Sequence, residues 1–304
     1  MDVQWTGVMP AVTTKFNTDD TLDLKMFAVN IQAQLDAGVN GIILGGTLGE
    51  ASTLTKEEKS SLVKNTIAIT ENKVPTIINI AEQSTKGAIE AANTAEKDGA
   101  KGLMLLPPMR YKADDRETVT YFKEIAKNTN LPIMIYNNPV DYGILVSLDM
   151  FDELTECTNI QAVKESTRDI SNIIRMRNKF GKRYSILTGV DTLGLESILS
   201  GADGWVAGLV CAFPKETVAI YKLAKAGKIK EALEIYSWFL PILELDINSK
   251  LVQNIKLAEV VTGIGTETVR APRLPLVGNE RKHVLSILEK GLKTRPTLPD
   301  YKNL

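Results

Sequence analysis

The strongest constraint on how this chain folds is a repeated alternation of short apolar runs with longer stretches of helical periodicity. The apolar runs are continuous rather than alternating, which is typical of strands covered on both faces. Eight strand-and-helix units, spaced by roughly 20 to 35 residues, predict an α/β fold, a closed (β/α)8 barrel. The predicted strands lie at Gly7–Val12, Gly41–Leu44, Pro75–Ile80, Gly102–Leu106, Ile133–Tyr136, Ile160–Lys164, Tyr184–Leu187 and Gly204–Gly208.

The sequence after the eighth predicted strand indicates helices only. No linker rich in Pro, Gly or Ser separates these helices from the barrel. We therefore expect a barrel domain over residues 1–213 and a helical extension over residues 214–304 that packs on the barrel. The predicted helices of this extension are Pro214–Ala226, Lys228–Leu243, Leu251–Thr262 and Glu280–Leu292.

Charge and histidine content exclude several classes of function. The chain has 36 Lys and Arg residues and 37 Asp and Glu residues, for a formal net charge of −1, so it lacks the basic excess of a nucleic-acid binder. The one histidine, His283, lies in a polar segment, which argues against a Ser-His-Asp triad or a multi-histidine metal site. We expect an activity that needs neither a metal nor another cofactor.

Cysteine usage and hydropathy bear on the compartment. Cys157 and Cys211 form no CxxC pair, so two free thiols in a reducing compartment are expected. The longest apolar run, Gly204 to Phe213, is about half the length of a membrane span, and the first residues show no secretory pattern. The sequence predicts a soluble, cytoplasmic protein whose partner is a small molecule rather than a nucleic acid or a membrane.

The active site of such a barrel lies at the carboxyl ends of its strands. The second predicted strand ends in the glycine-rich turn Gly45–Glu50, whose backbone amides suit a carboxylate or a phosphate. This turn lacks the Lys-Ser or Lys-Thr ending of a nucleotide-binding loop, which disfavours ATP.

Lys164 and Tyr136 end two neighbouring strands in this prediction. A lysine at the barrel mouth loses hydration, which lowers its pKa and favours a neutral amine able to attack a carbonyl. The other interpretation of Lys164 is an ion-pair partner inside the barrel, with Glu165 as the candidate partner. Tyr136 is either a proton shuttle for the same spot or a packed aromatic residue with one hydrogen bond.

Taken together, several motifs carry a resemblance to a known family. They are Gly46–Glu50, Leu54–Glu58, Tyr136–Pro139, Val163–Glu165 with its lysine 28 residues after the tyrosine, Gly189, and Gly204–Gly208. With these motifs the chain resembles, over essentially its whole length, the dihydrodipicolinate synthase / N-acetylneuraminate lyase family of Schiff-base enzymes.

The resemblance implies a barrel with carboxy-terminal helices, usually a homotetramer, and no cofactor. It implies that Lys164 forms an imine with C2 of a 2-oxo acid and that Tyr136 relays protons. The turn at Thr47 and Leu48 would hold the substrate carboxylate. The other substrate-binding positions that it suggests are Gly46, Asp141, Gly189, Val206 and Tyr111.

Three departures from the family pattern concern the substrate. Relatives commonly have Thr-Thr or Ser-Thr where this chain has Thr47-Leu48, so Leu48 brings no hydroxyl to the proton relay. Arg110 aligns with the second tyrosine of the family's proton relay, and Tyr111 beside it is an alternative. Asp141 stands where true dihydrodipicolinate synthases have an arginine for a second carboxylate, which argues against activity in lysine biosynthesis.

Within the family, residues 136–143 and 270–276 look most similar to Δ1-pyrroline-4-hydroxy-2-carboxylate deaminases of hydroxyproline degradation. Such a deaminase converts a cyclic imino acid to 2-oxoglutarate semialdehyde and ammonia. The alternatives are a pyruvate-dependent aldolase, or a dehydratase or aldolase for 2-keto-3-deoxy sugar acids. Dihydrodipicolinate synthase itself ranks below these, and a non-catalytic barrel that binds a keto acid ranks last.

Overall fold

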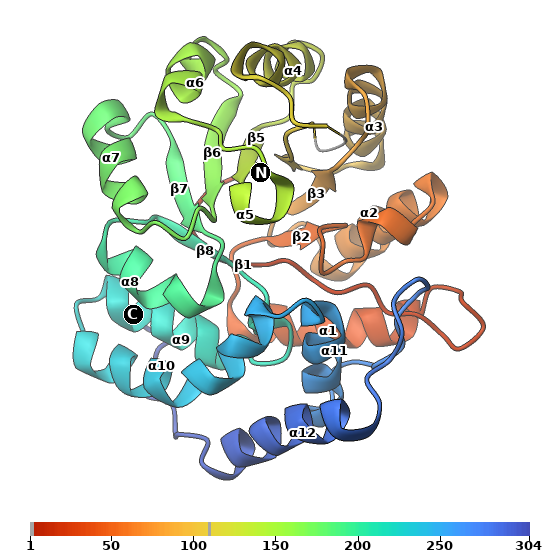
Figure 1. The fold of residues 1–304 in the computed structure, drawn as a ribbon. Helices are drawn as coiled ribbons and strands as arrows, with labels where there is room; N and C mark the ends of the chain where they lie inside the picture. Colours follow the sequence, from red (N-terminus) through yellow and green to blue (C-terminus); the bar gives the residue numbers. More distant parts are fainter. Residues whose placement is uncertain (1–2, 109–110) are drawn as a thin grey trace.

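The computed structural model describes residues 3–108 and 111–304, and its centre is a barrel of eight parallel strands (Figure 1). Neighbouring strands pair in the order β1-β8-β7-β6-β5-β4-β3-β2. A parallel bridge between Ala11 and Ile43 brings β1 beside β2 and closes the ring. The predicted (β/α)8 barrel is thus confirmed. The strands are β1 Gly7–Pro10, β2 Ile42–Leu44, β3 Thr76–Ile80, β4 Gly102–Leu105, β5 Ile133–Asn137, β6 Ile160–Glu165, β7 Ser185–Thr188 and β8 Gly204–Ala207.

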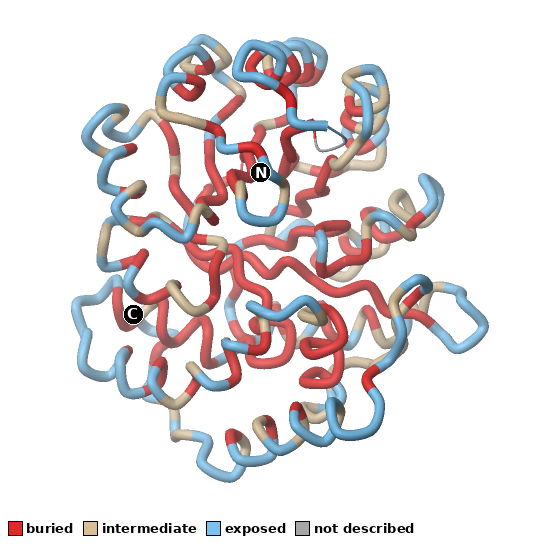
Figure 2. The backbone as a smooth tube through the Cα atoms, viewed as in Figure 1, coloured by how far each residue is buried: buried red, intermediate tan, exposed pale blue. Residues whose placement is uncertain are grey.

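The strands are apolar throughout because both of their faces are covered. Every residue of β3 and β5 is buried, and Figure 2 shows buried backbone along the whole ring. Side chains of one face fill the barrel, and those of the other face pack under the helices. The surrounding helices are α1 Leu24–Ala37, α2 Lys56–Thr70, α3 Thr85–Asp98, α4 Asp115–Lys127, α5 Pro139–Tyr142, α6 Leu148–Glu153, α7 Ser171–Phe180 and α8 Gly194–Leu199.

Helix ends follow local sequence signals. Thr55 accepts a hydrogen bond from the backbone amide of Glu58, whose side chain accepts from the amide of Thr55, so the two residues form a capping box for α2. Gly38 and Gly99 end α1 and α3 with φ of 91° and 96°, a left-handed conformation that glycine adopts without strain.

The carboxy-terminal helices are α9 Pro214–Lys225, α10 Ile229–Leu243, α11 Leu251–Val261 and α12 Gly278–Lys293. α9 contacts β1, β8 and α8, whereas α10 and α11 both contact α12 on one side of the barrel (Figure 1). The 3₁₀ turn η5, Glu244–Ile247, joins α10 to α11. On α10, Phe239, Ile242 and Leu243 are buried, so this apolar stripe is part of the core.

Two buried ion pairs attach α11 to the barrel loops. Lys15, after β1, contacts Glu259 of α11 with its Nζ 3.0 Å from Oε1. Glu50, after β2, contacts Lys256 of α11 at 2.5 Å, and all four side chains are fully buried. Charges without water need partners this close, so these pairs fix the extension to the loops at the barrel mouth.

The two cysteines and the histidine lie away from any cluster of reactive groups that the sequence predicted. Cys157 and Cys211 are free thiols, the first half-buried and the second buried. His283 is exposed on α12. Among the described residues, no helix combines the length and the apolar character that a bilayer crossing requires.

Candidate active site

Lys164 and Tyr136 lie side by side at the carboxyl ends of β6 and β5. They are paired in the register of the two strands, so both side chains leave the sheet on the same face. The Lys164 Nζ lies 4.0 Å from the centroid of the Tyr136 ring. Both residues are buried. The two residues that the sequence singles out are therefore brought together.

Gly189, just after β7, leaves the space that the lysine occupies. A Cβ at this position would lie 2.5 Å from the Cε of Lys164 and 2.3 Å from the Oγ of Ser166. Any side chain larger than hydrogen would displace the lysine.

The environment of Lys164 favours an uncharged amine. Burial lowers the pKa of Lys164, and the nearby Tyr142, Asp246 and Asp191 oppose that shift only in part. The alternative interpretation, an ion pair with Glu165, is wrong. Glu165 lies on the other face of β6, where its carboxylate accepts from the amide of Thr167 and from Asn172, each at 2.8 Å.

Tyr136 is held as a neutral phenol. Burial raises the pKa of Tyr136 to about 12. Its hydroxyl accepts a hydrogen bond of 3.1 Å from the Nδ2 of Asn138. A phenol in this state can donate its proton and, as the phenolate, take one back, so the interpretation as a proton shuttle fits the geometry.

Tyr142 is a site residue that sequence reasoning missed. Its hydroxyl lies 2.6 Å from the Oγ1 of Thr47, and its ring meets that of Tyr136 edge to face with centroids 5.4 Å apart. The short helix α5 begins with Pro139 and is capped by the Asn138 side chain. The sequence does show a tyrosine six residues after Tyr136. However, only the path of α5 shows that the side chain of Tyr142 returns to the site.

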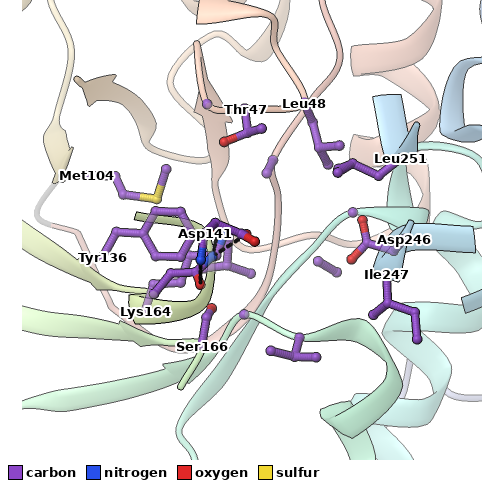
Figure 3. A pocket seen from close by; sticks show the side chains of 18 of the residues that line it. Thr47, Leu48, Met104, Tyr136, Asp141, Lys164, Ser166, Asp246, Ile247 and Leu251 are labelled. Atoms are coloured by element: carbon purple, nitrogen blue, oxygen red, sulfur yellow. Dashed lines mark hydrogen bonds between the residues drawn. The ribbon is translucent and has the colours of Figure 1, made fainter. Parts of the chain in front are cut away.

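A cavity of about 710 Å³, including its open mouth, surrounds the Lys164 amine (Figure 3). All but one of the expected site residues line it. The exception is Tyr111, which is 58% exposed in the turn before α4 and faces solvent. Arg110, the other candidate at that place, lies outside the described residues. The expected residues that line the cavity are Gly46, Thr47, Leu48, Tyr136, Asp141, Lys164, Gly189 and Val206.

The cavity has further polar walls that the sequence did not indicate. Ser166 is buried, and its hydroxyl has no hydrogen-bond partner among the described residues. Arg168 lies at the rim with a positive φ of 65°, an uncommon conformation for a residue other than glycine. Asp246, Ile247 and Leu251 come from η5 and α11 and lie opposite Lys164 in Figure 3.

The turn that carries Thr47 and Leu48 is fixed from below by Glu50. The Glu50 carboxylate is fully buried. It forms an ion pair with the Lys256 amine and accepts a hydrogen bond of 3.0 Å from the backbone amide of Arg270. Burial lowers the pKa of Lys256 to about 8. Glu50 is therefore a positioning residue, since it holds the turn without reaching the cavity.

Among residues 3–108 and 111–304, no three His, Cys, Asp or Glu side chains converge on one point. What the arrangement provides is a desolvated amine, two phenols and the turn of Gly46, Thr47 and Leu48 at the cavity wall. These groups suit attack on a carbonyl or imine carbon followed by proton transfer.

The fold and the site define a class I lyase, an enzyme of the Schiff-base kind. The model of the dihydrodipicolinate synthetase family matches residues 4–291, and the chain belongs to this family. The 4-hydroxy-tetrahydrodipicolinate synthase of Exiguobacterium sibiricum is 32% identical over 301 residues, which cover 98% of both chains.

Solved structures of family members match closely. The dihydrodipicolinate synthase DapA-2 of Bacillus anthracis superimposes with a TM-score of 0.91 at 26% identity, over 97% of this chain and 100% of that one. A chloride-inhibited dihydrodipicolinate synthase from Acinetobacter baumannii, complexed with pyruvate, also reaches 0.91 at 26% identity, over 95% of this chain and 99% of that one.

Proposed function

We propose that Lys164 forms a Schiff base with C2 of a 2-oxo acid or of its cyclic imine. The observation that carries this proposal is the buried Lys164 amine, which has a lowered pKa and lies 4.0 Å from the centre of the Tyr136 ring. A neutral amine is the nucleophilic form of lysine. The relative from Acinetobacter baumannii is complexed with pyruvate, the simplest 2-oxo acid, which supports this substrate class.

The specific reaction that we propose is the conversion of Δ1-pyrroline-4-hydroxy-2-carboxylate and water to 2-oxoglutarate semialdehyde and ammonia. Lys164 adds to the C2=N bond, and the C2–N bond to the ring nitrogen then breaks, which leaves an amine on C5 and an imine to the enzyme. Tyr136 gives its proton to the departing ring nitrogen and, as a phenolate, accepts the proton from C3. The electron pair of that C–H bond expels the 4-hydroxyl, which takes the proton from Tyr136 and leaves as water. Transfer of a proton from C5 to C3 gives an enamine at C4 and C5, which tautomerises to an imine at C5. Hydrolysis of this imine releases ammonia and forms the aldehyde, and hydrolysis at C2 frees the lysine.

The turn of Thr47 and Leu48 holds the single substrate carboxylate in this proposal. The Leu48 side chain is buried, so its contribution is the backbone amide. The contact between the hydroxyls of Thr47 and Tyr142 connects this turn with the ring beside Tyr136, and Thr47 is exposed. In this proposal Tyr142, of the same chain, passes protons between Tyr136 and solvent once the substrate lies between the two tyrosines and Thr47.

Asp141 supports a substrate with one carboxylate. It is exposed at the mouth, where its Oδ2 accepts a hydrogen bond of 2.7 Å from Asn138. A carboxylate here repels a second substrate carboxylate, which argues against the synthase reaction named for the relatives.

The alternatives within the class are a pyruvate-dependent aldolase and a dehydratase or aldolase for 2-keto-3-deoxy sugar acids. We also propose a cytoplasmic homotetramer, which the family resemblance implies.

A substrate panel with Lys164→Ala as control tests the proposal. Efficient release of ammonia from the pyrroline substrate supports the deaminase, whereas aldol cleavage or synthesis with pyruvate supports the aldolase. Borohydride reduction followed by mass spectrometry identifies the residue that carries the adduct. Turnover that survives Lys164→Ala would exclude the Schiff-base mechanism for any substrate.

A further inference from the structure

Asp246 reaches the active-site cavity from outside the barrel strands. It belongs to η5, the connection between α10 and α11, and its carboxylate rests against the backbone of Gly208. A Cβ at Gly208 would lie 2.8 Å from the Oδ1 of Asp246, so the glycine makes this approach possible. Figure 3 shows the carboxylate across the cavity from Lys164 and Tyr136, where the distal end of an imine-bound substrate would lie.

The Asp246 carboxylate differs from its two acidic neighbours because it lacks a partner. Asp191 accepts hydrogen bonds from the Trp205 indole and from the amides of Gly208 and Leu209, the last at 2.7 Å. Asp141 accepts from Asn138. Within the described residues, the Asp246 side chain takes part in no hydrogen bond or ion pair, and it is half-buried. Ser166, at the same cavity, is buried, and its hydroxyl has no partner among these residues. Unpaired polar groups of this kind are expected where a ligand completes them.

The charges around Asp246 indicate which chemical group of a ligand would bind to its carboxylate. Burial, and then the neighbouring charge of Asp191, raise the pKa of Asp246 well above its usual value, with Lys164 and Arg168 opposing the shift. A donor group on the substrate stabilises the ionised form of Asp246 and so opposes this shift, whereas an additional carboxylate would add to the negative charges of Asp141 and Asp191 and would be repelled. A hydroxyl or an ammonium group would instead donate a hydrogen bond to the free carboxylate, and hydrogen bonds to charged groups are stronger than those between neutral groups.

We propose that Asp246 selects the substrate by binding a hydrogen-bond donor, a hydroxyl or an ammonium group, on the carbons beyond the imine. The inference rests on the proposed imine at Lys164, but it does not depend on the release of ammonia. It makes the substrate a 2-oxo acid with a donor at its far end rather than a second carboxylate. The selecting residue thus comes from the helical extension and not from the barrel.

The test measures the concentration of ligand that gives half-maximal borohydride trapping on Lys164. The ligands are pyruvate, which has no distal group, 4-hydroxy-2-oxobutanoate, which has a hydroxyl, 2-oxoglutarate, which has a carboxylate, and Δ1-pyrroline-2-carboxylate, which has an ammonium group after ring opening. The variants are Asp246→Ala and Asp246→Asn. The matched control is Glu244→Ala, on the same turn but exposed and outside the cavity lining.

Asp246→Ala should raise the half-maximal concentration of the hydroxyl and ammonium ligands about 10- to 100-fold, the loss expected for a charged hydrogen bond. Pyruvate should change by less than about 2-fold, on the same grounds, because it does not reach Asp246. Asp246→Asn keeps an acceptor for a hydroxyl but loses the charge that an ammonium needs, so its effect tells the two groups apart.

Three outcomes would overturn the inference. One is an equal loss for pyruvate and for the donor ligands, which would mean a structural role. A second is tighter trapping of 2-oxoglutarate than of the donor ligands by the unmodified protein. The third is no adduct with any ligand, which removes the imine itself. If these adducts form but Δ1-pyrroline-4-hydroxy-2-carboxylate releases no ammonia, only the deaminase reaction is refuted.

Discussion

Gly189→Ala perturbs the nucleophile without removing any polar group. The new methyl carbon would lie 2.5 Å from the Cε of Lys164 and 2.3 Å from the Oγ of Ser166. Carbon atoms pack at about 3.5 to 4.0 Å, so the lysine must move by roughly 1 Å or more. It has little room to do so, because its amine already lies 4.0 Å from the centre of the Tyr136 ring.

The size of the effect follows from that displacement. Overpacking of this kind costs about 1 to 3 kcal/mol of folding free energy, which a protein of this size tolerates. A misplacement of about 1 Å at a reacting group costs roughly 100-fold in rate. We therefore expect a folded protein with a somewhat lower melting temperature and a rate of imine formation reduced about 100-fold.

The assay is the initial rate of borohydride trapping of pyruvate on Lys164, followed by mass spectrometry. Gly201→Ala is the matched control, because a Cβ at this glycine meets nothing within 4 Å. Its φ of 103° makes alanine strained there, so the control includes a backbone cost that Gly189→Ala lacks. Trapping by Gly189→Ala at the rate of the unmodified protein would refute the claim that the space beside Lys164 is filled.

Three further predictions concern the same site. Lys164→Met should abolish trapping and raise the free energy of unfolding by about 1 to 4 kcal/mol, measured by denaturation. Because burial lowers the pKa of Lys164 in the folded state, this gain in stability should be larger at pH 7 than near pH 10.5. A loss of stability in the variant would contradict the reasoning. The trapping rate should rise with pH through an apparent pKa below 10.5, because only the neutral amine attacks, and a rise centred at or above 10.5 would count against it. Tyr142→Phe should lower kcat by about 100-fold or more with little change in trapping of pyruvate, because it removes the hydroxyl that meets Thr47; a kcat equal to that of the unmodified enzyme would exclude Tyr142 from the proton route.

Most of the barrel follows from local sequence. The apolar runs locate both ends of all eight strands to within two residues. They do so because strands that are covered on both faces are built mainly of apolar residues. The capping box at Thr55 and Glu58 also forms as its spacing predicts. These features depend on residues that are close together in the chain, so they can be predicted from the sequence.

The site was predictable where a strand carries the residue. Lys164 and Tyr136 end neighbouring strands, and the closed barrel brings such ends together. Tyr142 and Asp246 were missed because their positions depend on connections that turn back over the mouth, one of them from the extension. Such paths are set by packing between distant segments, and no local pattern reports them.

The two buried ion pairs have a consequence for how the chain is made. Lys15 and Glu50 leave the ribosome 244 and 206 residues ahead of their partners Glu259 and Lys256. At about 5 to 20 residues per second, this delay lasts at least about ten seconds. A charge buried without its partner costs several kcal/mol, so the loops after β1 and β2 stay hydrated until α11 has been synthesised. The turn that holds Thr47 is therefore completed late in synthesis, and a nascent chain that already contains Lys164 is not yet an enzyme.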